Sequence, residues 1–194
     1  MTSHRFASVL VVMGVLAGCQ QDSSPPADAQ SAPTAESTQA RSDLVAPGNS
    51  GLPVDPETGF SIVDHTLLES AKVAPCALDR LNGQSPGEGR VGVPAAGQLQ
   101  ASGWIVNGRK ESPERVFVVL KSDAATYAIA AGAGGNRPDV ARVLKAESAS
   151  RAGFRVSSTV SGVASGDYAV LLAQDTHGVV TLCPTKFEIS ILPG

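Results

Sequence analysis

Two stretches near the C-terminal end alternate apolar and polar side chains. They cover residues 154–160 and 187–191, and phenylalanine, valine or isoleucine fills their apolar positions. A period of two places successive side chains on opposite faces of a β-strand, with one face inward and one in water. The glycine-bounded turn 162–166 and the sequence Asp175-Thr176-His177-Gly178 bound a strand between them, and the second predicts a hairpin loop. The chain therefore has to bury one side of several short strands.

Further strands are predicted upstream of this region. Residues 116–120 are apolar without alternation, which predicts a central strand covered on both sides or one that faces a helix. Short strands with glycine-rich turns favour an antiparallel β-sandwich or a barrel. Residues 60–73 allow two interpretations, because 60–63 fit an edge strand and 67–71 fit a helical turn.

One segment, 137–144, carries the signals of a helix start. Pro138 would occupy the first helical position and Asp139 the first turn. Val140, Val143 and Leu144 then share one face. We expect a short helix inserted between strands and packed on the sheet, in an otherwise mainly β domain.

Composition divides the chain into a polar leader and a folded part. Residues 20–58 consist mostly of Ala, Ser, Pro, Gln, Thr and acidic residues, without an aromatic side chain, and such a stretch buries too little surface to fold. We expect a disordered tether over 19–58, although a leader with no spacing role fits the composition equally well. The remaining residues, 59–194, are enough for one domain with one core.

The N-terminal residues resemble the signal peptide of a bacterial lipoprotein. Arg5 precedes an apolar run from Phe6 to Ala17, which is too short to span a bilayer. The run closes with Leu16-Ala17-Gly18-Cys19, which resembles a lipobox. In that family the peptide, here 1–18, is cut before the cysteine, and Cys19 is acylated and holds the protein on the membrane. The alternative is a plain signal peptide with an incidental cysteine.

The lipoprotein resemblance implies a place in the bacterial cell envelope. Gln20 after the anchor favours the outer membrane, with the domain facing either the periplasm or the surface. Two cysteines remain, Cys76 and Cys183, and an even remainder in an oxidising compartment suggests a disulfide. Two cysteines without a nearby histidine pair do not make a structural metal site, so no metal is expected. The net charge of −3 gives no electrostatic footprint for nucleic acid.

No catalytic constellation is evident. His65 and His177 are the histidines that could serve as a base in the mature chain, but no nucleophile motif accompanies either. The glycines of 132–138 are similar to those of a phosphate loop, yet the motif lacks Gly-Lys-Ser/Thr. We therefore assign no catalytic residue and no cofactor.

Three aromatic residues are candidates for glycan binding. Trp104, the single tryptophan, could form a stacking platform with Tyr127 and Tyr168. A lone tryptophan in a β-sandwich lies more often in the core. Tyr168 also resembles the tyrosine corner of immunoglobulin-like sandwiches, in which the hydroxyl serves the fold.

Several motifs together resemble a poorly characterised family of β-sandwich modules. The family occurs in bacterial envelope lipoproteins, and similar modules are appended to surface-glycan enzymes. The resemblance spans residues 76–192 and rests on Cys76-Ala77-Leu78-Asp79-Arg80-Leu81-Asn82-Gly83, Ser102-Gly103-Trp104, Arg137-Pro138-Asp139-Val140, Ala152-Gly153-Phe154 and Leu182-Cys183-Pro184. It implies an immunoglobulin-like fold with a Cys76–Cys183 bridge and carries no catalytic residue. A fold does not by itself imply an activity.

These features lead to two expectations for function. The first is a lipid-anchored, non-enzymatic accessory or binding protein of the bacterial envelope, which contacts another envelope protein or a glycan. The alternative is a carbohydrate-binding module for envelope or surface glycans. The two differ in what they require of Trp104, because only the second needs its indole to be exposed.

Overall fold

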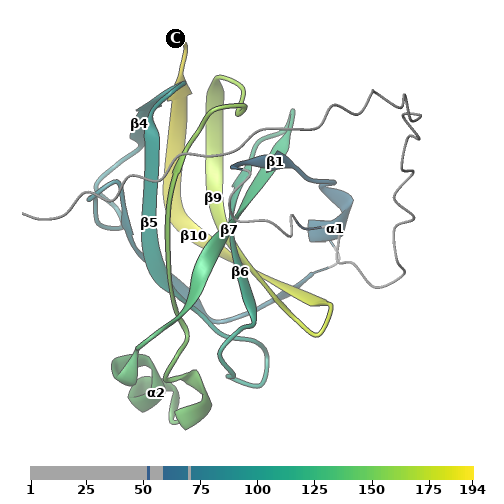
Figure 1. Ribbon diagram of the computed structural model, residues 1–194, viewed down its shortest axis with the longest axis vertical. Helices are drawn as coiled ribbons and strands as arrows, with labels where there is room; N and C mark the ends of the chain where they lie inside the picture. Colours follow the sequence, from purple (N-terminus) through teal and green to yellow (C-terminus); the bar gives the residue numbers. More distant parts are fainter. Residues whose placement is uncertain (1–51, 53–58, 70) are drawn as a thin grey trace, which may run out of the picture. The chain divides into compact units, whose positions relative to one another are not determined.

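The computed structural model describes Leu52, residues 59–69 and residues 71–194. The predicted signal peptide 1–18 and all of the tether 19–58 except Leu52 lie outside these residues. The described elements, shown in Figure 1, are β1 (Ser61–Ile62), α1 (Thr66–Glu69), β2 (Lys72–Val73), β3 (Cys76–Leu81), β4 (Val91–Pro94), β5 (Gln98–Ile105), β6 (Arg115–Lys121), β7 (Thr126–Gly135), α2 (Pro138–Leu144), the 3-10 helix η1 (Glu147–Ala149), β8 (Gly153–Thr159), β9 (Gly166–Thr176) and β10 (Val179–Leu192).

The strands form one sheet that curls back on itself into a sandwich. Its strand order is β2-β10-β9-β6-β7-β8-β5-β3, with β1 paired to β7 and β4 paired to β10. The first part of β7 pairs with β6 and the last part with β8, so β7 joins the two halves. Pairing is antiparallel except where β10 meets β2 and β4. The prediction of a mainly β, immunoglobulin-like sandwich with a short inserted helix is confirmed.

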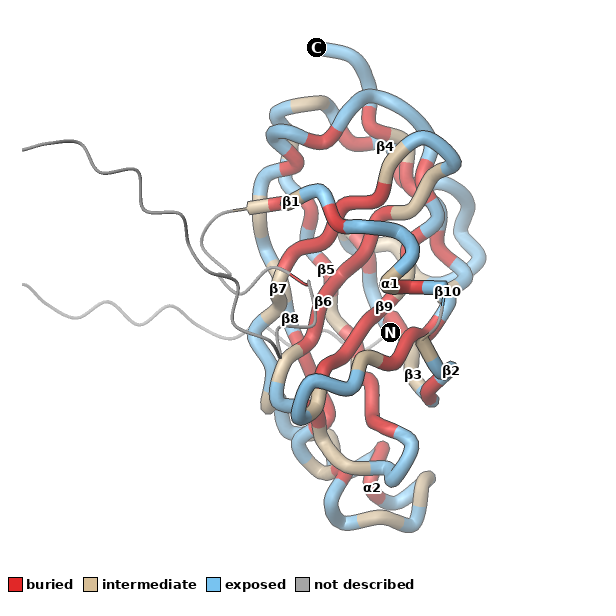
Figure 2. The backbone as a smooth tube through the Cα atoms, turned by 90° about the vertical axis from the view of Figure 1, so that its right-hand side faces the viewer, coloured by how far each residue is buried: buried red, intermediate tan, exposed pale blue. Residues whose placement is uncertain are grey.

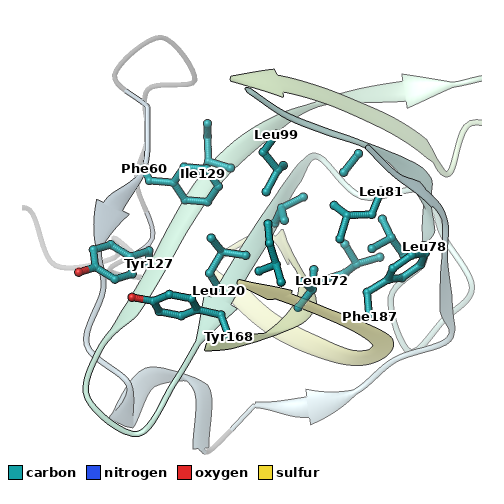
Figure 3. Packing of buried hydrophobic residues seen from close by; sticks show 14 of the residues in the cluster. Phe60, Leu78, Leu81, Leu99, Leu120, Tyr127, Ile129, Tyr168, Leu172 and Phe187 are labelled. Atoms are coloured by element: carbon teal, nitrogen blue, oxygen red, sulfur yellow. The ribbon is translucent and has the colours of Figure 1, made fainter. Parts of the chain in front are cut away.

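The core lies between the two halves of the curled sheet. Alternate residues of the longer strands enter it, as the period of two predicts, and Figure 2 shows buried segments running through the middle of the domain. Its members come from both halves and from the start of the domain, and those labelled in Figure 3 are Phe60, Leu78, Leu81, Leu99, Leu120, Tyr127, Ile129, Tyr168, Leu172 and Phe187.

A second apolar cluster lies on the outer face of the β6–β9 half. Phe117 and Val119 of β6 point away from the main core and are nevertheless fully buried. Val63 and Leu68 cover them from the β1–α1 segment, and Leu52 adds to the cover. This is why 116–120 lacks alternation, and the prediction of a strand covered on both sides is confirmed.

The segment from 60 to 73 contains both of the structures that the sequence allowed. Two residues pair with β7 as β1, one helical turn follows as α1, and two residues pair with β10 as β2. Asp64 begins the turn, because its carboxylate accepts hydrogen bonds from the N–H and hydroxyl of Thr66. These bonds lower the pKa of Asp64.

The inserted helix α2 begins at Pro138, as predicted. It ends at Leu144, and the capping residue Lys145 takes the left-handed conformation with φ of 52° and donates its N–H to the last turn. The helix packs at the end of the sandwich, where Val140 joins Val106, which follows β5. The expectation that Val143 shares the packed face is wrong, since 78% of this side chain is exposed. A seven-residue helix at an edge buries only one narrow side.

Candidate functional site

The two predicted disulfide partners are bonded. Cys76 opens β3 and Cys183 lies in β10, with their Cα atoms 6.1 Å apart. The bond therefore joins the free edge of one half of the sheet to the other half. The prediction of a Cys76–Cys183 bridge is confirmed. Cys19, the predicted lipid anchor, lies outside the described residues.

Tyr127 and Tyr168 belong to the core and do not present a ring face to solvent. Their side chains are 5% and 4% exposed, and their rings meet edge to face with centroids 5.9 Å apart (Figure 3). The Tyr168 hydroxyl donates to the carbonyl of Ala164 over 2.7 Å. The N–H of Ala164 donates to the Tyr127 hydroxyl over 3.3 Å. This geometry is that of a tyrosine corner.

Burial raises the pKa of the Tyr168 hydroxyl, and the neighbouring Tyr127 raises it further. The hydroxyl is therefore held in the protonated form that donates to Ala164. The tyrosine pair has a structural role. The sequence indicated this role for Tyr168 alone, because Tyr127 lies far from the corner along the chain.

Trp104 lies on a different surface from the two tyrosines. It is half-buried near the end of β5, where it packs against the small cluster formed by Val106, Val140, Ala149 and Ala152. The three aromatic candidates therefore do not form one stacking platform. The indole of Trp104 keeps a partly exposed position on the outer side of its strand, together with Ser102 two residues earlier.

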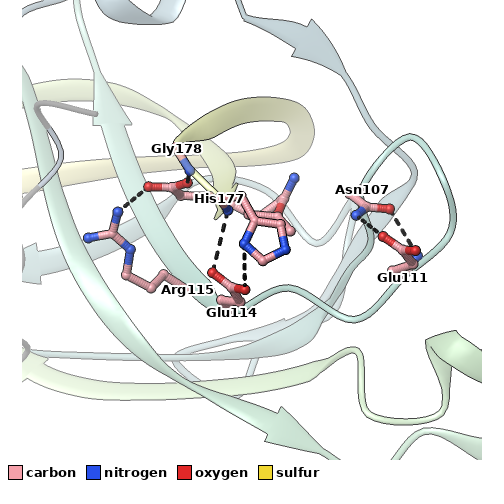
Figure 4. A network of polar contacts seen from close by, with 9 residues as sticks. Asn107, Glu111, Glu114, Arg115, His177 and Gly178 are labelled. Carbon is pink, nitrogen blue, oxygen red and sulfur yellow. Dashed lines mark hydrogen bonds and ion pairs between the residues drawn. The ribbon is translucent and has the colours of Figure 1, made fainter. Parts of the chain in front are cut away.

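The two candidate histidines are exposed and each contacts one carboxylate. His65 lies 3.2 Å from Glu69 on α1, and His177 lies 3.1 Å from Glu114. His177 occupies the two-residue β9–β10 turn with φ of 54°, so the predicted hairpin loop is confirmed. Figure 4 shows this contact beside the ion pair of Arg115 with the buried Asp175.

The ion pair between Arg115 and Asp175 helps to hold the β9–β10 hairpin in place. The second oxygen of Asp175 accepts the N–H of Gly178, so one buried carboxylate holds both the turn and the neighbouring strand β6. Neither His65 nor His177 lines the hollows described below. The histidines therefore lie apart from these three hollows.

The outer face of the other half of the sheet is polar. Side chains of β5 and β8 alternate between the core and this face, and the residues facing outward are cross-strand partners. Ser102 is paired with Arg155, Gln100 with Ser157 and Gln98 with Thr159. We call this surface the polar face, defined by Gln98, Gln100, Ser102, Arg155, Ser157 and Thr159.

A trough of about 550 Å³ opens on the polar face at its β7 side. Its floor is largely backbone, because five glycines line it, and Ser102, Arg137 and Arg155 stand around them. The glycines are Gly132, Gly134, Gly135 and Gly153, with Gly103 of β5 also contributing. We call this cavity the glycine trough. A second hollow of about 400 Å³ shares Ser102 and Arg155 with it and extends along β5 and β8.

The structural reason for glycine differs from one position of the trough to another. A Cβ on Gly153 would lie 2.8 Å from the carbonyl oxygen of Gly135, so the close approach of β7 and β8 requires glycine there. Gly134 has φ of +87°, which also favours glycine. At Gly132, in contrast, a Cβ would meet only the Arg155 carbonyl at an ordinary 3.5 Å. The backbone does not require glycine at 132, and its missing side chain leaves the floor of the trough open.

Charged side chains surround the glycine trough unevenly. Arg137 is bound by Asp79 over 2.7 Å and by Asp139 over 2.8 Å. The Arg137 guanidinium lowers the pKa of Asp139 to about 2, and these bonds raise the pKa of Arg137 itself. Arg155 is exposed, and within 59–69 and 71–194 no carboxylate forms an ion pair with it. Positive charge is thus neutralised at the Arg137 side of the trough and available at the Arg155 side.

A third hollow, of about 540 Å³, lies on the β9–β10 half. Its Arg90 is bound by both Asp167 and Glu188, and Lys121 and Asp123 also line it. Among the residues that the structure describes, no three potential metal ligands come together. No helix in the same part of the chain is long and apolar enough to cross a membrane. We take the polar face with its glycine trough as the candidate site, because the exposed Arg155 lines two adjoining hollows there together with Ser102.

Sequence reasoning did not identify the polar face, although its signal is present. Residues 98–105 alternate polar and apolar side chains in the same way as 154–160, and the outward members of both stretches are hydrophilic or small. What the sequence lacks is the pairing of these stretches, which makes one surface of two strands. No protein-family model and no curated protein matches this chain.

Proposed function

We propose that this protein is a lipid-anchored, non-enzymatic binding protein of the bacterial cell envelope, held on the outer membrane through Cys19. The β-sandwich would contact another envelope component through the polar face. The observation that carries the binding part of the proposal is the glycine trough of about 550 Å³ with the exposed Arg155 at its side.

The groups on the polar face are suited to holding a ligand. Serine and threonine hydroxyls both donate and accept hydrogen bonds, glutamine amides do the same, and arginine donates in a planar fork. The bare backbone of Gly132 lets a flat ligand approach the strand closely. The histidines, which could serve as proton acceptors, lie on other surfaces. This division favours recognition over catalysis.

The place where the first described residues pack also supports the polar face as the binding surface. Leu52 and the β1–α1 segment pack on the outer face of the β6–β9 half, on Phe117 and Val119. The polar face is the outer face of the opposite half, which contains β3, β5 and β8, and Figure 1 shows β5 on the side away from β1 and α1. The polar face is thus not covered by Leu52 or by the β1–α1 segment.

A carbohydrate-binding module is the second candidate, and the position of Trp104 favours it. The indole lies on the outer side of β5, two residues after Ser102, and is half-buried rather than enclosed in the core. An aromatic ring beside hydroxyl and amide groups is a common setting for a sugar ring. Tyr127 and Tyr168 have no part in this version of the proposal, because both are buried.

Site-specific photocrosslinking in intact cells tests the binding surface. A photoreactive amino acid in place of Ser157 would lie on the polar face, and one in place of Lys72 would lie on the exposed edge strand β2 as a matched control. We expect adducts from position 157 and none from position 72. Adducts from position 72 with none from position 157 would place the partner elsewhere on the domain. Protease or glycosidase treatment of the adduct then identifies its chemistry.

The anchor is tested separately. Cys19→Ser removes the sulfur that would receive the lipid, and we expect the variant to leave the detergent-phase membrane fraction. Mass spectrometry of the unaltered protein should show an acylated N-terminal Cys19 and the loss of residues 1–18. A variant that stays in the membrane fraction with the mass of the uncleaved chain would contradict the lipobox interpretation.

A further inference from the structure

We infer that the occupant of the polar face is an acidic saccharide chain, with a carboxylate bound by Arg155 and one sugar ring seated in the glycine trough. The inference rests on the proposed function, since it names the ligand class of the same surface. It concerns carboxylated sugars in a chain, such as hexuronate polymers, rather than neutral glycans.

Charge is the first argument for an acidic ligand. Ser102 of β5 pairs with Arg155 on one side and with Arg80 of β3 on the other. Two arginines therefore flank one serine on the two neighbouring strands, about 10 Å apart at the usual spacing of strands. Arg80 gives one N–H group to the carbonyl of Gly83 and keeps others free to donate, and Arg155 has no carboxylate partner in the described part of the chain. A planar carboxylate matches the fork of an arginine.

Arg137 and Arg155 differ in whether a carboxylate already binds them. Arg137, on the other side of the trough, is held by Asp79 and Asp139 and is only 21% exposed in its side chain. It is thereby fixed as part of the wall. Arg155 is exposed and lines both the glycine trough and the hollow beside it. An anion placed between these two cavities would reach Arg155 without displacing an existing ion pair.

Shape is the second argument, and it favours a sugar ring at the trough. Gly132 leaves an open floor of backbone in a position where the fold would accept a side chain. A flat, rigid ring can lie on such a floor, and its hydroxyls can reach Ser102. Side chains at 132 and 134 would lift the ring away from the strand.

The length of the polar face indicates a chain rather than a single sugar. Outward side chains run from Gln98 to Ser102 along β5, which is roughly 13 Å at the rise of a strand. Ser157 and Thr159 run beside them on β8, so hydroxyl and amide groups continue past the trough. Trp104 extends the same side of β5 in the other direction and can stack on a further ring. The surface thus offers successive positions along one line.

Other anionic occupants fit the surface less well. The headgroup of an acidic phospholipid would bring acyl chains, and these need apolar surface, whereas every residue that defines the polar face is polar. The rows of amides and hydroxyls match a ligand with many hydroxyl groups. A phospholipid is nevertheless a clear alternative for Arg155 to bind, and the experiment below includes it.

The test uses the full-length lipoprotein in detergent and measures its binding by calorimetry. The probes are polygalacturonate, alginate and hyaluronate, each compared with the same polymer after reduction of its carboxylates to alcohols. Phosphatidylglycerol–phosphatidylcholine vesicles test the lipid source of an anion. Raising the ionic strength should weaken binding of the acidic polymers, because salt screens exposed charges.

Two pairs of variants assign the binding to the site. Arg155→Ala removes the exposed cation, and Arg142→Ala removes the same charge from the exposed side of α2 as a control. Gly132→Val fills the trough, and Gly92→Val adds the same side chain at an exposed position of β4, where a Cβ would meet Leu192 at 3.7 Å. Arg155→Lys keeps the charge without the fork. Thermal unfolding of each variant confirms that it is folded.

We expect at least one acidic polymer to bind and its carboxyl-reduced form to lose this binding. Arg155→Ala should weaken the affinity by about tenfold to a hundredfold, the usual cost of a lost hydrogen bond to a charged group. Gly132→Val should weaken it by at least about tenfold because the ring is displaced. Both controls should stay within about twofold, and Arg155→Lys should lie between Arg155→Ala and the unaltered protein.

Three results would overturn the inference. The first is equal affinity for an acidic polymer and its reduced form, and the second is an Arg155→Ala variant that binds as tightly as Arg142→Ala. The third is vesicle binding that depends on Arg155 with no binding of any acidic polymer. In each of these cases crosslinks from position 157 would still support the polar face as the binding surface, and only missing crosslinks would contradict that part of the proposed function.

Discussion

Tyr168→Phe is predicted to destabilise the domain without affecting ligand binding. The substitution removes one hydroxyl and keeps the ring, whose edge-to-face contact with Tyr127 has a centroid distance of 5.9 Å. The lost group donates the 2.7 Å hydrogen bond to the Ala164 carbonyl. Because Tyr168 is 4% exposed, water does not readily replace this donor.

The size of the effect follows from this geometry. Loss of a buried hydrogen bond with its acceptor left behind costs about 1–3 kcal/mol. The retained ring packing keeps the cost in the lower half of this range, so we expect the free energy of unfolding to fall by about 1.5 kcal/mol. For a domain of this size the melting temperature should then drop by about 5 °C. Tyr127→Phe should cost less, because its hydroxyl accepts only the longer 3.3 Å bond from the Ala164 N–H.

The pH dependence gives an independent readout. The folded state raises the pKa of Tyr168 above its ordinary value of 10.0, so the folded protein holds this proton more tightly than the unfolded chain. The stabilisation is complete below the unfolded pKa and is lost as the pH rises through 10 toward the folded pKa. Tyr168→Phe removes this group, so its stability should fall less steeply over the same alkaline range.

Urea denaturation followed by tryptophan fluorescence measures both effects, at neutral pH and along an alkaline series. A Tyr168→Phe variant as stable as the unaltered protein would refute the structural role of the hydroxyl. So would a Tyr127→Phe variant with the larger loss. Weakened ligand binding in a folded Tyr168→Phe variant would instead bring back the interpretation of this tyrosine as part of a binding platform.

Three further predictions concern other parts of the domain. Reduction of Cys76–Cys183, or its replacement by serines, should lower the free energy of unfolding by up to about 4–5 kcal/mol in urea, because the bond closes a loop with a sequence separation of 107. NMR titration should give Asp139 a pKa of about 2, which moves toward 3.8 in Arg137→Ala; the stabilisation by this pair is present above pH 3.8 and fades toward about 2. Leu68→Ala should cost about 2–4 kcal/mol in denaturation experiments, and an unchanged stability would show that α1 merely rests on the sheet.

The strands were predictable where one face is buried and the other is solvated. The alternation at 154–160 and 187–191 corresponds to β8 and to the end of β10, since a period of two carries over directly into a sandwich. The start of α2 was also predictable, because Pro138 acts locally. Residues 60–73 were not, because two-residue strands and one helical turn are too short to show a period.

The candidate site was less accessible from the sequence. Trp104 was correctly identified as ambiguous, but no local signal shows how far an indole is covered by a helix that comes about 35 residues later. Tyr168 was recognised as a possible tyrosine corner, whereas the buried position of Tyr127 depends on long-range packing. The glycines at 132 and 153 gain their meaning from the pairing of β7 with β8. Pairing between strands is the information that a single sequence does not display.

The disulfide also decides how the domain responds to mechanical load. A pull on the chain before Gly59 first meets β1, α1 and β2, which are held by short pairings, by the apolar cover and by Phe60 in the main core. These residues can peel away and release roughly 60 Å of extended chain. The force then arrives at Cys76, where a covalent bond passes it to β10 at Cys183. Residues 59–75 therefore extend first under load, while the disulfide holds β3 to β10. The polar face keeps its shape as the preceding segment lengthens.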